Sequence, residues 1–125
     1  MIRNVLLCDD NPDNLFLLHT ILEEFGYHVD IASNGEEVLN RIEVEIPDLL
    51  ILDLFMPGMN GYDVARFIRK HPSFKSLPVL LITTSSSSRI TKKCRNYVNE
   101  VVEKPIDLEV LHAKVLYLEA KCCHN

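Results

Sequence analysis

The sequence predicts an α/β fold in which five strand–helix repeats form one parallel sheet covered by helices. Short apolar runs rich in leucine, isoleucine and valine alternate with segments whose apolar residues recur at helical spacing, and this happens five times in 125 residues. Several runs are apolar on both faces, which is typical of parallel strands buried between two helix layers. With right-handed crossovers between strands, the expected architecture is a (βα)5 three-layer sandwich.

Five segments have the length and composition of strands. They are Asn4 to Cys8, His28 to Ala32, Leu49 to Leu52, Val79 to Thr83 and Val98 to Val102. Between them, four sets of apolar residues each share one helix face. The sets are Leu15, Leu18, Leu22 and Phe25; Leu39, Ile42 and Ile46; Val64, Phe67 and Ile68; and Leu108, Leu111, Val115 and Leu118.

Helix start signals agree with these positions, because asparagine and aspartate accept hydrogen bonds from the first free backbone N–H groups. The signals are Asn11 before Pro12, Asn34 before Glu37, Asn60 before Asp63, and Asp107 before Glu109. The helical pattern is weakest between Thr83 and Val98, where Ser85 to Ser88 precede a segment with more basic than apolar residues. We expect a short or mobile fourth helix there.

Composition limits the domain organisation and the partners. One domain over residues 1–125, without an output domain, accounts for the length. A net charge of −5 argues against nucleic acid as a partner. No apolar run is long enough for a membrane span and the cysteines lay out no disulfide framework, so we expect a cytoplasmic protein. The tail Cys122-Cys123-His124 is interpreted as a helix end, since adjacent thiols chelate metal poorly.

Polar residues follow four of the predicted strands. They are Asp9, Asp10, Asp53, Thr83 and Lys104. Loops at the carboxyl ends of parallel strands surround the ligand crevice of such sheets, so these side chains should converge. Taken singly, the Asp pair is explained as helix N-terminal charge and Asp53 as a turn residue. Their joint placement favours a functional site.

Three carboxylates packed together repel one another, and a bound cation removes the conflict. Oxygen ligands of this kind suit Mg²⁺, which takes one or two protein carboxylates together with phosphate oxygens. With Mg²⁺ on one side and the Lys104 ammonium on the other, the charge of a phosphoryl group would be stabilised during transfer to a carboxylate. The predicted chemistry is an aspartyl-phosphate site centred on Asp53.

The stretch from Asp53 to Gly61 reads Asp-Leu-Phe-Met-Pro-Gly-Met-Asn-Gly. Together with Asp9-Asp10, Thr83 and Lys104-Pro105, it resembles the receiver domain of response regulators in two-component signalling, including the chemotaxis regulator. The resemblance covers essentially the whole chain and implies a flavodoxin-like sheet of strand order 2-1-3-4-5. It also implies a switch, not an enzyme, which receives its phosphoryl group from a histidine kinase or a phosphotransfer protein.

The resemblance assigns roles to individual residues. Asp53 would be phosphorylated, and Asp10, Asp53 and the backbone carbonyl of Phe55 would ligate Mg²⁺. Asp9 would act mostly through metal-bound water. Phe55 has no polar side-chain atom with which to position a hydrolytic water, which predicts slow loss of the phosphoryl group.

The remaining roles concern the phosphoryl oxygens and the readout. Lys104 would bind a phosphoryl oxygen beside a cis Lys104–Pro105 bond, and Thr83 would move toward the phosphate. Relatives usually carry an aromatic residue three positions before the lysine, and its rotation follows the hydroxyl. Here that residue is Val101, a β-branched side chain with no ring to turn, so the output is expected to differ.

The resemblance also implies a partner surface, formed by the fourth helix, fifth strand and fifth helix. Tyr97-Val98 stands where a small pair is common in relatives, so specificity for the downstream protein target is expected to be altered there. A dimer through this surface stays open.

Two other functions remain open. A degenerate receiver that serves only as a protein-binding module is favoured by Val101 and disfavoured by the complete acid cluster. A phosphatase with an aspartyl nucleophile usually has a second acid two residues after the nucleophile, and here that residue is Phe55.

Overall fold

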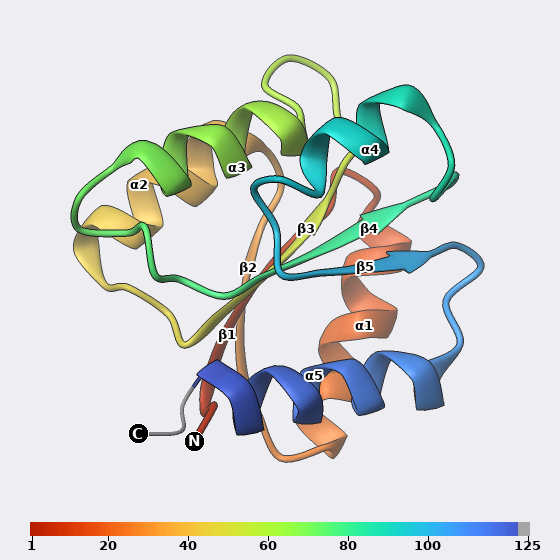
Figure 1. The fold of residues 1–125 in the computed structure, drawn as a ribbon. Helices are drawn as coiled ribbons and strands as arrows, with labels where there is room; N and C mark the ends of the chain where they lie inside the picture. The colour runs from red at the N-terminus through yellow and green to blue at the C-terminus, as the bar shows by residue number, and fades with distance from the viewer. Residues whose placement is uncertain (123–125) are drawn as a thin grey trace.

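The protein, seen in a computed structural model that describes residues 1–122, is a five-stranded parallel sheet between two layers of helices (Figure 1). The strands are β1 (Asn4–Cys8), β2 (His28–Ala32), β3 (Leu49–Asp53), β4 (Val79–Thr83) and β5 (Glu100–Glu103). The helices are α1 (Pro12–Glu24), α2 (Gly35–Val44), α3 (Gly61–Lys70), α4 (Arg89–Cys94) and α5 (Leu108–Cys122). The strand order is β2-β1-β3-β4-β5, which confirms the flavodoxin-like prediction.

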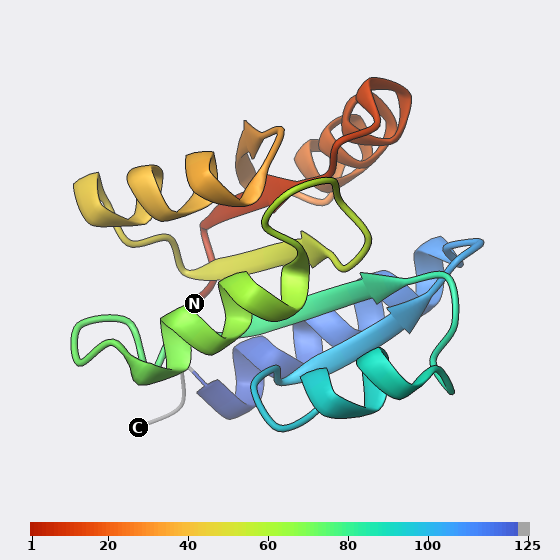
Figure 2. The same ribbon diagram turned by 90° about the horizontal axis from the view of Figure 1, so that it is seen from above.

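Side chains on alternate faces of the strands build two separate cores. Along β1, Leu6 and Cys8 face one core while Val5 and Leu7 face the other. Helices α2, α3 and α4 cover the first core, and α1 and α5 cover the second (Figure 2). Strands β3 and β4 are buried throughout, so polar chemistry in the middle of the sheet is confined to the strand ends.

The predicted helix caps form hydrogen bonds that also fix the loops after the strands. The acceptors are Asn11 (from the N–H of Asp13, 2.9 Å), Asn34 (Glu37, 2.9 Å), Asn60 (Asp63, 3.0 Å) and Asp107 (Glu109, 2.9 Å). The Asp63 carboxylate in turn accepts a hydrogen bond from the N–H of Asn60 at 3.2 Å, and the two bonds form a capping box. Each cap contributes about 1 kcal/mol to stability. Asn11 ends the loop after β1, which contains Asp9, and Asn60 ends the loop after β3, which begins directly after Asp53.

Three strand boundaries differ from the prediction, since β5 also ends one residue later, at Glu103 instead of Val102. Strand β5 begins at Glu100 instead of Val98, because the N–H groups of Tyr97 and Val98 donate to the Cys94 carbonyl in the turn that ends α4 (2.8 and 3.1 Å). Strand β3 continues one residue beyond Leu52 and includes Asp53. The short fourth helix is confirmed, since α4 has only 6 residues.

Two apolar residues assigned to helix faces are exposed. Helix α2 ends at Val44, which leaves Ile46 outside it and 49% exposed, while Val38 and Ile42 of the helix are buried. Phe67 is 41% exposed on α3, where Ala65 takes the buried position. Ile46 is exposed because the helix ends before it, and Phe67 because helical spacing alone does not show which of two nearby apolar side chains faces the core.

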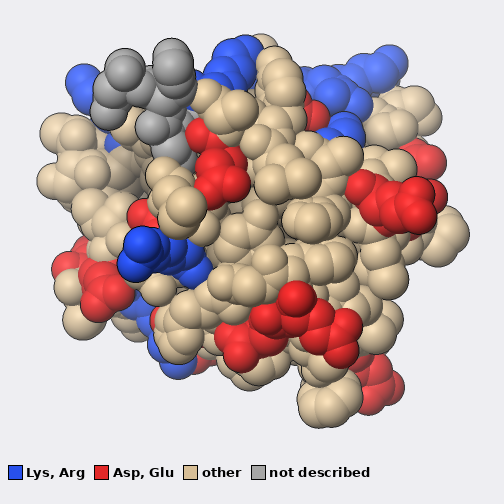
Figure 3. All heavy atoms as spheres, turned by 90° about the horizontal axis from the view of Figure 1, so that it is seen from below, with Lys and Arg blue, Asp and Glu red and all other residues tan. Residues whose placement is uncertain are grey.

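Two further observations concern the described residues, 1–122: whether a helix could span a membrane, and how charge is distributed on one face. None of the described helices is both long and apolar enough to cross a membrane. On the face seen from below in Figure 3, acidic and basic groups form small separate clusters among neutral side chains. Residues 123 and 124 of the tail Cys122-Cys123-His124 lie outside the described part of the chain, so their interpretation stays a prediction.

Gly61 offers a test of how α3 is held against the end of β3. A Cβ added at Gly61 would lie 2.7 Å from the Asp53 carbonyl oxygen and 2.8 Å from the Leu54 Cα, both of them backbone atoms. We therefore expect Gly61→Ala to lower the free energy of unfolding by about 2 kcal/mol. Urea denaturation measures this, with the exposed Ser76→Ala as control. Equal midpoints for both variants would contradict the close approach.

Candidate functional site

Three carboxylates meet at the carboxyl edge of the sheet. Asp9 and Asp10 follow β1, and Asp53 is the last residue of the adjacent strand β3. Ligand oxygens of the three lie within 4.8 Å of one another. Asp9 and Asp53 are almost completely buried, with 1% and 3% of their surface exposed, whereas Asp10 is exposed. The cluster is therefore reached from solvent on the Asp10 side.

The two buried acids are only partly satisfied by the protein. Asp9 Oδ1 accepts a hydrogen bond from the Asn11 N–H at 2.9 Å. Within residues 1–122, Asp9 Oδ2 and Asp53 Oδ1 have no hydrogen-bond partner. Lys104 is the nearby cation, with Nζ at 3.5 Å from Asp53 Oδ2 and 3.7 Å from Asp9 Oδ2. One ammonium thus faces two buried carboxylates.

This imbalance changes the acidity of Asp53. Burial, together with the charge of Asp9 and against the opposing effect of Lys104, raises the pKa of Asp53 from 3.8 to about 6. A second cation beside the free oxygen would relieve the same conflict. Clustered carboxylate oxygens are the donor set of a small, hard divalent ion, so the residues present fit such a metal.

Lys104 is held by its backbone as well as by charge. The Lys104 N–H donates to the Thr83 carbonyl at 2.8 Å, which ties the end of β5 to the end of β4. The Lys104–Pro105 bond is cis, as predicted. The ammonium of Lys104 lies between Asp9 and Asp53, within 3.7 Å of an oxygen of each.

Thr83, in contrast, is occupied elsewhere. Its hydroxyl is fully buried and pairs with the Thr91 hydroxyl of α4 at 3.0 Å, and it also contacts the backbone of Ser85. Thr91 donates to the Ser85 carbonyl at 2.7 Å and accepts from the Ser88 hydroxyl at 2.8 Å. The structure thus places Thr83 at the predicted edge but brings it together with α4, not with Asp53.

Thr91 and Ser88 are functional candidates that the sequence pattern did not single out. Ser85 to Ser88 were interpreted only as the opening of a weak helix. Ser88 in fact caps α4 by accepting from the Thr91 N–H at 3.2 Å. A cap signal three residues before a threonine was present, but nothing in the spacing showed that this threonine would be buried against Thr83.

The two departures in side-chain type have clear structural positions. Val101 is 7% exposed and packs in the core that includes Cys94 of α4, so the position of the usual aromatic residue is filled by a small, buried side chain. Phe55 is 45% exposed in the loop after β3, two residues beyond Asp53.

The fold and the acid cluster together define a phosphoacceptor domain of two-component signalling. The family model of the response regulator receiver domain matches residues 5–116, and the chain belongs to this family. Protein PilH of Pseudomonas aeruginosa is 31% identical over 109 residues, which cover 86% of this chain and 89% of PilH.

Solved structures give the same result. The signal receiver domain of a signal transduction histidine kinase from Syntrophus aciditrophicus has a TM-score of 0.91 and 30% identity, covering 98% of this chain and 94% of its own. Response regulator TrrA from Thermotoga maritima, in complex with Mg(2+)-BeF, has a TM-score of 0.84 and 37% identity, covering 94% of this chain and 99% of its own.

The raised pKa of Asp53 predicts how stability depends on pH in metal-free buffer. The folded state holds the proton more tightly than the unfolded state, so ionisation of Asp53 should lower stability as the pH rises from about 4 to above 6. The Asp53→Asn variant has no carboxyl group to ionise at this position and therefore does not lose this stability as the pH rises. At about pH 7.5 we expect it to be more stable than the wild type by about 2 to 3 kcal/mol, and the gap should close near pH 4.

Urea unfolding across this pH range, in the presence of a chelator, checks the prediction. The exposed Glu43→Gln provides a charge-matched control and should show no such pH-dependent gap. A wild type that is as stable as Asp53→Asn at every pH would show that Asp53 is not strained by its neighbours.

Proposed function

We propose that Asp53 is the phosphoacceptor of this receiver domain and that its phosphorylation switches the domain between two conformations. The observation that carries the proposal is a buried carboxylate with one unpaired oxygen, set between two acids and a lysine at the end of a central strand. This arrangement favours a cation beside the free oxygen, and the charge of that cation would in turn offset the negative charge of an incoming phosphoryl group.

Mg²⁺ is the cofactor that we assign to the acid cluster. Asp10, Asp53 and the carbonyl of Phe55 would hold it, with Asp9 acting mostly through bound water. The ion would supply positive charge to the oxygens of the transferring group. From the other side Lys104, with its ammonium 3.5 Å from Asp53, would bind a phosphoryl oxygen.

The transfer itself needs little from the protein beyond position and charge. A carboxylate oxygen of Asp53 forms a bond to phosphorus, the bond between phosphorus and the donor breaks, and the leaving group keeps the electron pair. The donor is a histidine kinase or a phosphotransfer protein. We place the whole function in one domain that spans residues 1–125.

A switch is favoured over an enzyme with turnover. The residue two positions after Asp53 is Phe55, whose exposed ring offers no acid or base to a hydrolytic water. A protein-binding module without phosphorylation is disfavoured, because such a module has no use for three clustered carboxylates that repel one another.

The readout is proposed to begin at Thr83. Movement of its hydroxyl toward the phosphoryl group would break the 3.0 Å bond to Thr91 and release α4 from β4. The face of α4, β5 and α5 is the proposed surface for a downstream protein or a second copy. Val110 and Tyr117 on α5 are 44% and 52% exposed and available to such a partner.

The central test is phosphorylation of the purified chain by acetyl phosphate. With Mg²⁺ we expect the intact mass to increase by one phosphoryl group in the wild type, and without Mg²⁺ or in Asp53→Asn we expect almost no increase. Asp13→Asn, an exposed acid in the first turn of α1, serves as control and should behave as the wild type. An equal gain in Asp53→Asn would assign the acceptor to another residue, and many turnovers of donor would favour the phosphatase.

Phe55 provides a second prediction, on the lifetime of the phosphorylated state. Because its side chain cannot orient a water, Phe55→Asn should shorten the lifetime about tenfold. Removal of the donor followed by time-resolved intact mass gives the decay rate. Phe67→Asn, which alters an exposed phenylalanine on α3, is the control. Identical decay of wild type and Phe55→Asn would reject the explanation.

A further inference from the structure

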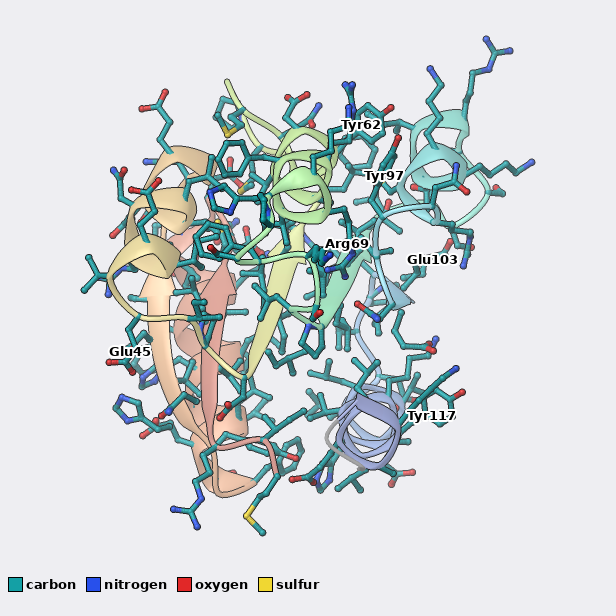
Figure 4. All side chains as sticks on the ribbon, turned by 60° about the vertical axis from the view of Figure 1, so that its left-hand side comes forward. Glu45, Tyr62, Arg69, Tyr97, Glu103 and Tyr117 are labelled. Carbon is teal, nitrogen blue, oxygen red and sulfur yellow. The ribbon has the colours of Figure 1, made fainter. Side chains whose placement is uncertain are left out.

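Helix α4 is strongly basic in a chain of net charge −5. Arg89, Lys92 and Lys93 lie on the helix, Arg95 follows it, and all four are exposed. Among residues 1–122, no carboxylate forms an ion pair with any of them. Long nitrogen-ended side chains project outward from α4 in Figure 4. An acidic protein that keeps an unpaired basic surface presents it to something anionic.

A groove of about 440 Å³ lies beside these charges, between α3, α4 and the loop after β3. Its lining residues are Phe55, Tyr62, Ser88, Arg89, Ile90 and Lys93. Aromatic and aliphatic side chains dominate the walls, while Arg89 and Lys93 are the charged members and no acid lines it. The groove therefore combines an apolar interior with a positive rim.

One wall of the groove is braced by aromatic contacts. Tyr62 of α3 meets Tyr97, in the turn after α4, edge-to-face with ring centroids 5.9 Å apart (Figure 4). The Arg66 guanidinium lies 5.2 Å from the Tyr62 ring on its own helix. A rigid aromatic wall opposite the exposed Phe55 ring favours insertion of one large apolar side chain, because little side-chain entropy is lost on binding.

We propose that this groove docks an acidic segment of a partner protein that inserts one large apolar side chain between Phe55 and Tyr62. The carboxylates of the segment would pair with Arg89 and Lys93. The site lies on the α3 side of α4, whereas the surface shared with β5 and α5 lies on its other side. Charge complementarity decides the class of partner, since a nucleic acid or an anionic membrane would be repelled by the acidic remainder of the chain.

The groove is connected to the acid cluster by two routes. Phe55 is two residues beyond Asp53, and its backbone belongs to the proposed metal site. Ser88 lines the groove and donates to Thr91, whose hydroxyl pairs with Thr83. Phosphorylation that draws Thr83 toward Asp53 thus rearranges one wall of the groove. This link to Asp53 rests on the proposed function, while docking in the groove does not.

Peptide binding to the unmodified, unphosphorylated chain tests the docking. The probe is a synthetic acidic peptide with a central Leu-Phe pair, followed by fluorescence anisotropy and by amide chemical shifts. We expect a dissociation constant of about 10 to 100 μM, with the largest shifts at groove residues. Replacing the peptide's aromatic residue by alanine, or its acids by lysines, should weaken binding about tenfold or more.

Variants of the protein separate the groove from general charge. Lys93→Glu should weaken binding at least about tenfold, whereas Lys92→Glu changes an equally exposed lysine on the same helix that does not line the groove. The control variant, Lys92→Glu, should lose less than about threefold in peptide affinity. Equal losses in the two variants, shifts spread over the surface, or tighter binding of duplex DNA or anionic vesicles than of the peptide would overturn the proposal.

Phosphorylation is measured separately on the same samples by intact mass. Peptide binding in the groove without phosphoryl uptake would support the docking and reject the proposed function. Phosphoryl uptake with no peptide binding in the groove would support the proposed function and overturn the docking. If both occur, loading with acetyl phosphate and Mg²⁺ should change the affinity several-fold in the wild type and leave Asp53→Asn unchanged.

Discussion

The burial of two carboxylates beside a single ammonium is the constraint on which the rest of the site depends. Asp9 follows β1 and Asp53 ends β3, and both are almost completely buried at the edge of the two apolar cores, so neither can turn toward water without disrupting the packing around it. Lys104 offsets part of their repulsion, and the raised pKa of Asp53 reflects the part that remains. A site with this residual imbalance gains stability from any group that brings positive charge to the free oxygens.

Strand order explains why these groups meet. β1 and β3 are neighbours although a strand and two helices separate them in sequence, and this brings Asp9 and Asp10 next to Asp53. β4 and β5 follow on the other side of β3, and the bond from the Lys104 N–H to the Thr83 carbonyl fixes their ends. The caps at Asn11 and Asn60 then start α1 and α3 at defined positions. The chemistry is thus a property of topology, since no short segment of the chain contains it.

Much of this could be predicted from the sequence, because apolar strand runs and asparagine caps are local signals. The edge residues Asp9, Asp53 and Lys104 were predictable for the same reason, since the end of an apolar run marks the end of a strand. What the sequence could not show depends on packing between elements. Helix α2 ends before Ile46, and the turn at Tyr97 delays β5; neither end could be read from the apolar spacing alone.

Thr91 is the clearest case of such a tertiary effect, and it bears on how a receiver without the usual aromatic residue can signal. A rotating ring needs space, and Val101 is packed with its neighbours at 7% exposure. A hydroxyl needs only a partner. If Thr83 turns away, Thr91 keeps its bonds to Ser85 and Ser88, and the part-buried Ser85 N–H loses its acceptor, so the movement costs chiefly that one hydrogen bond. Because Ser88 caps α4, such a change would reach the first turn of that helix directly, and in the proposed readout a bond between two hydroxyls would replace the swing of a ring.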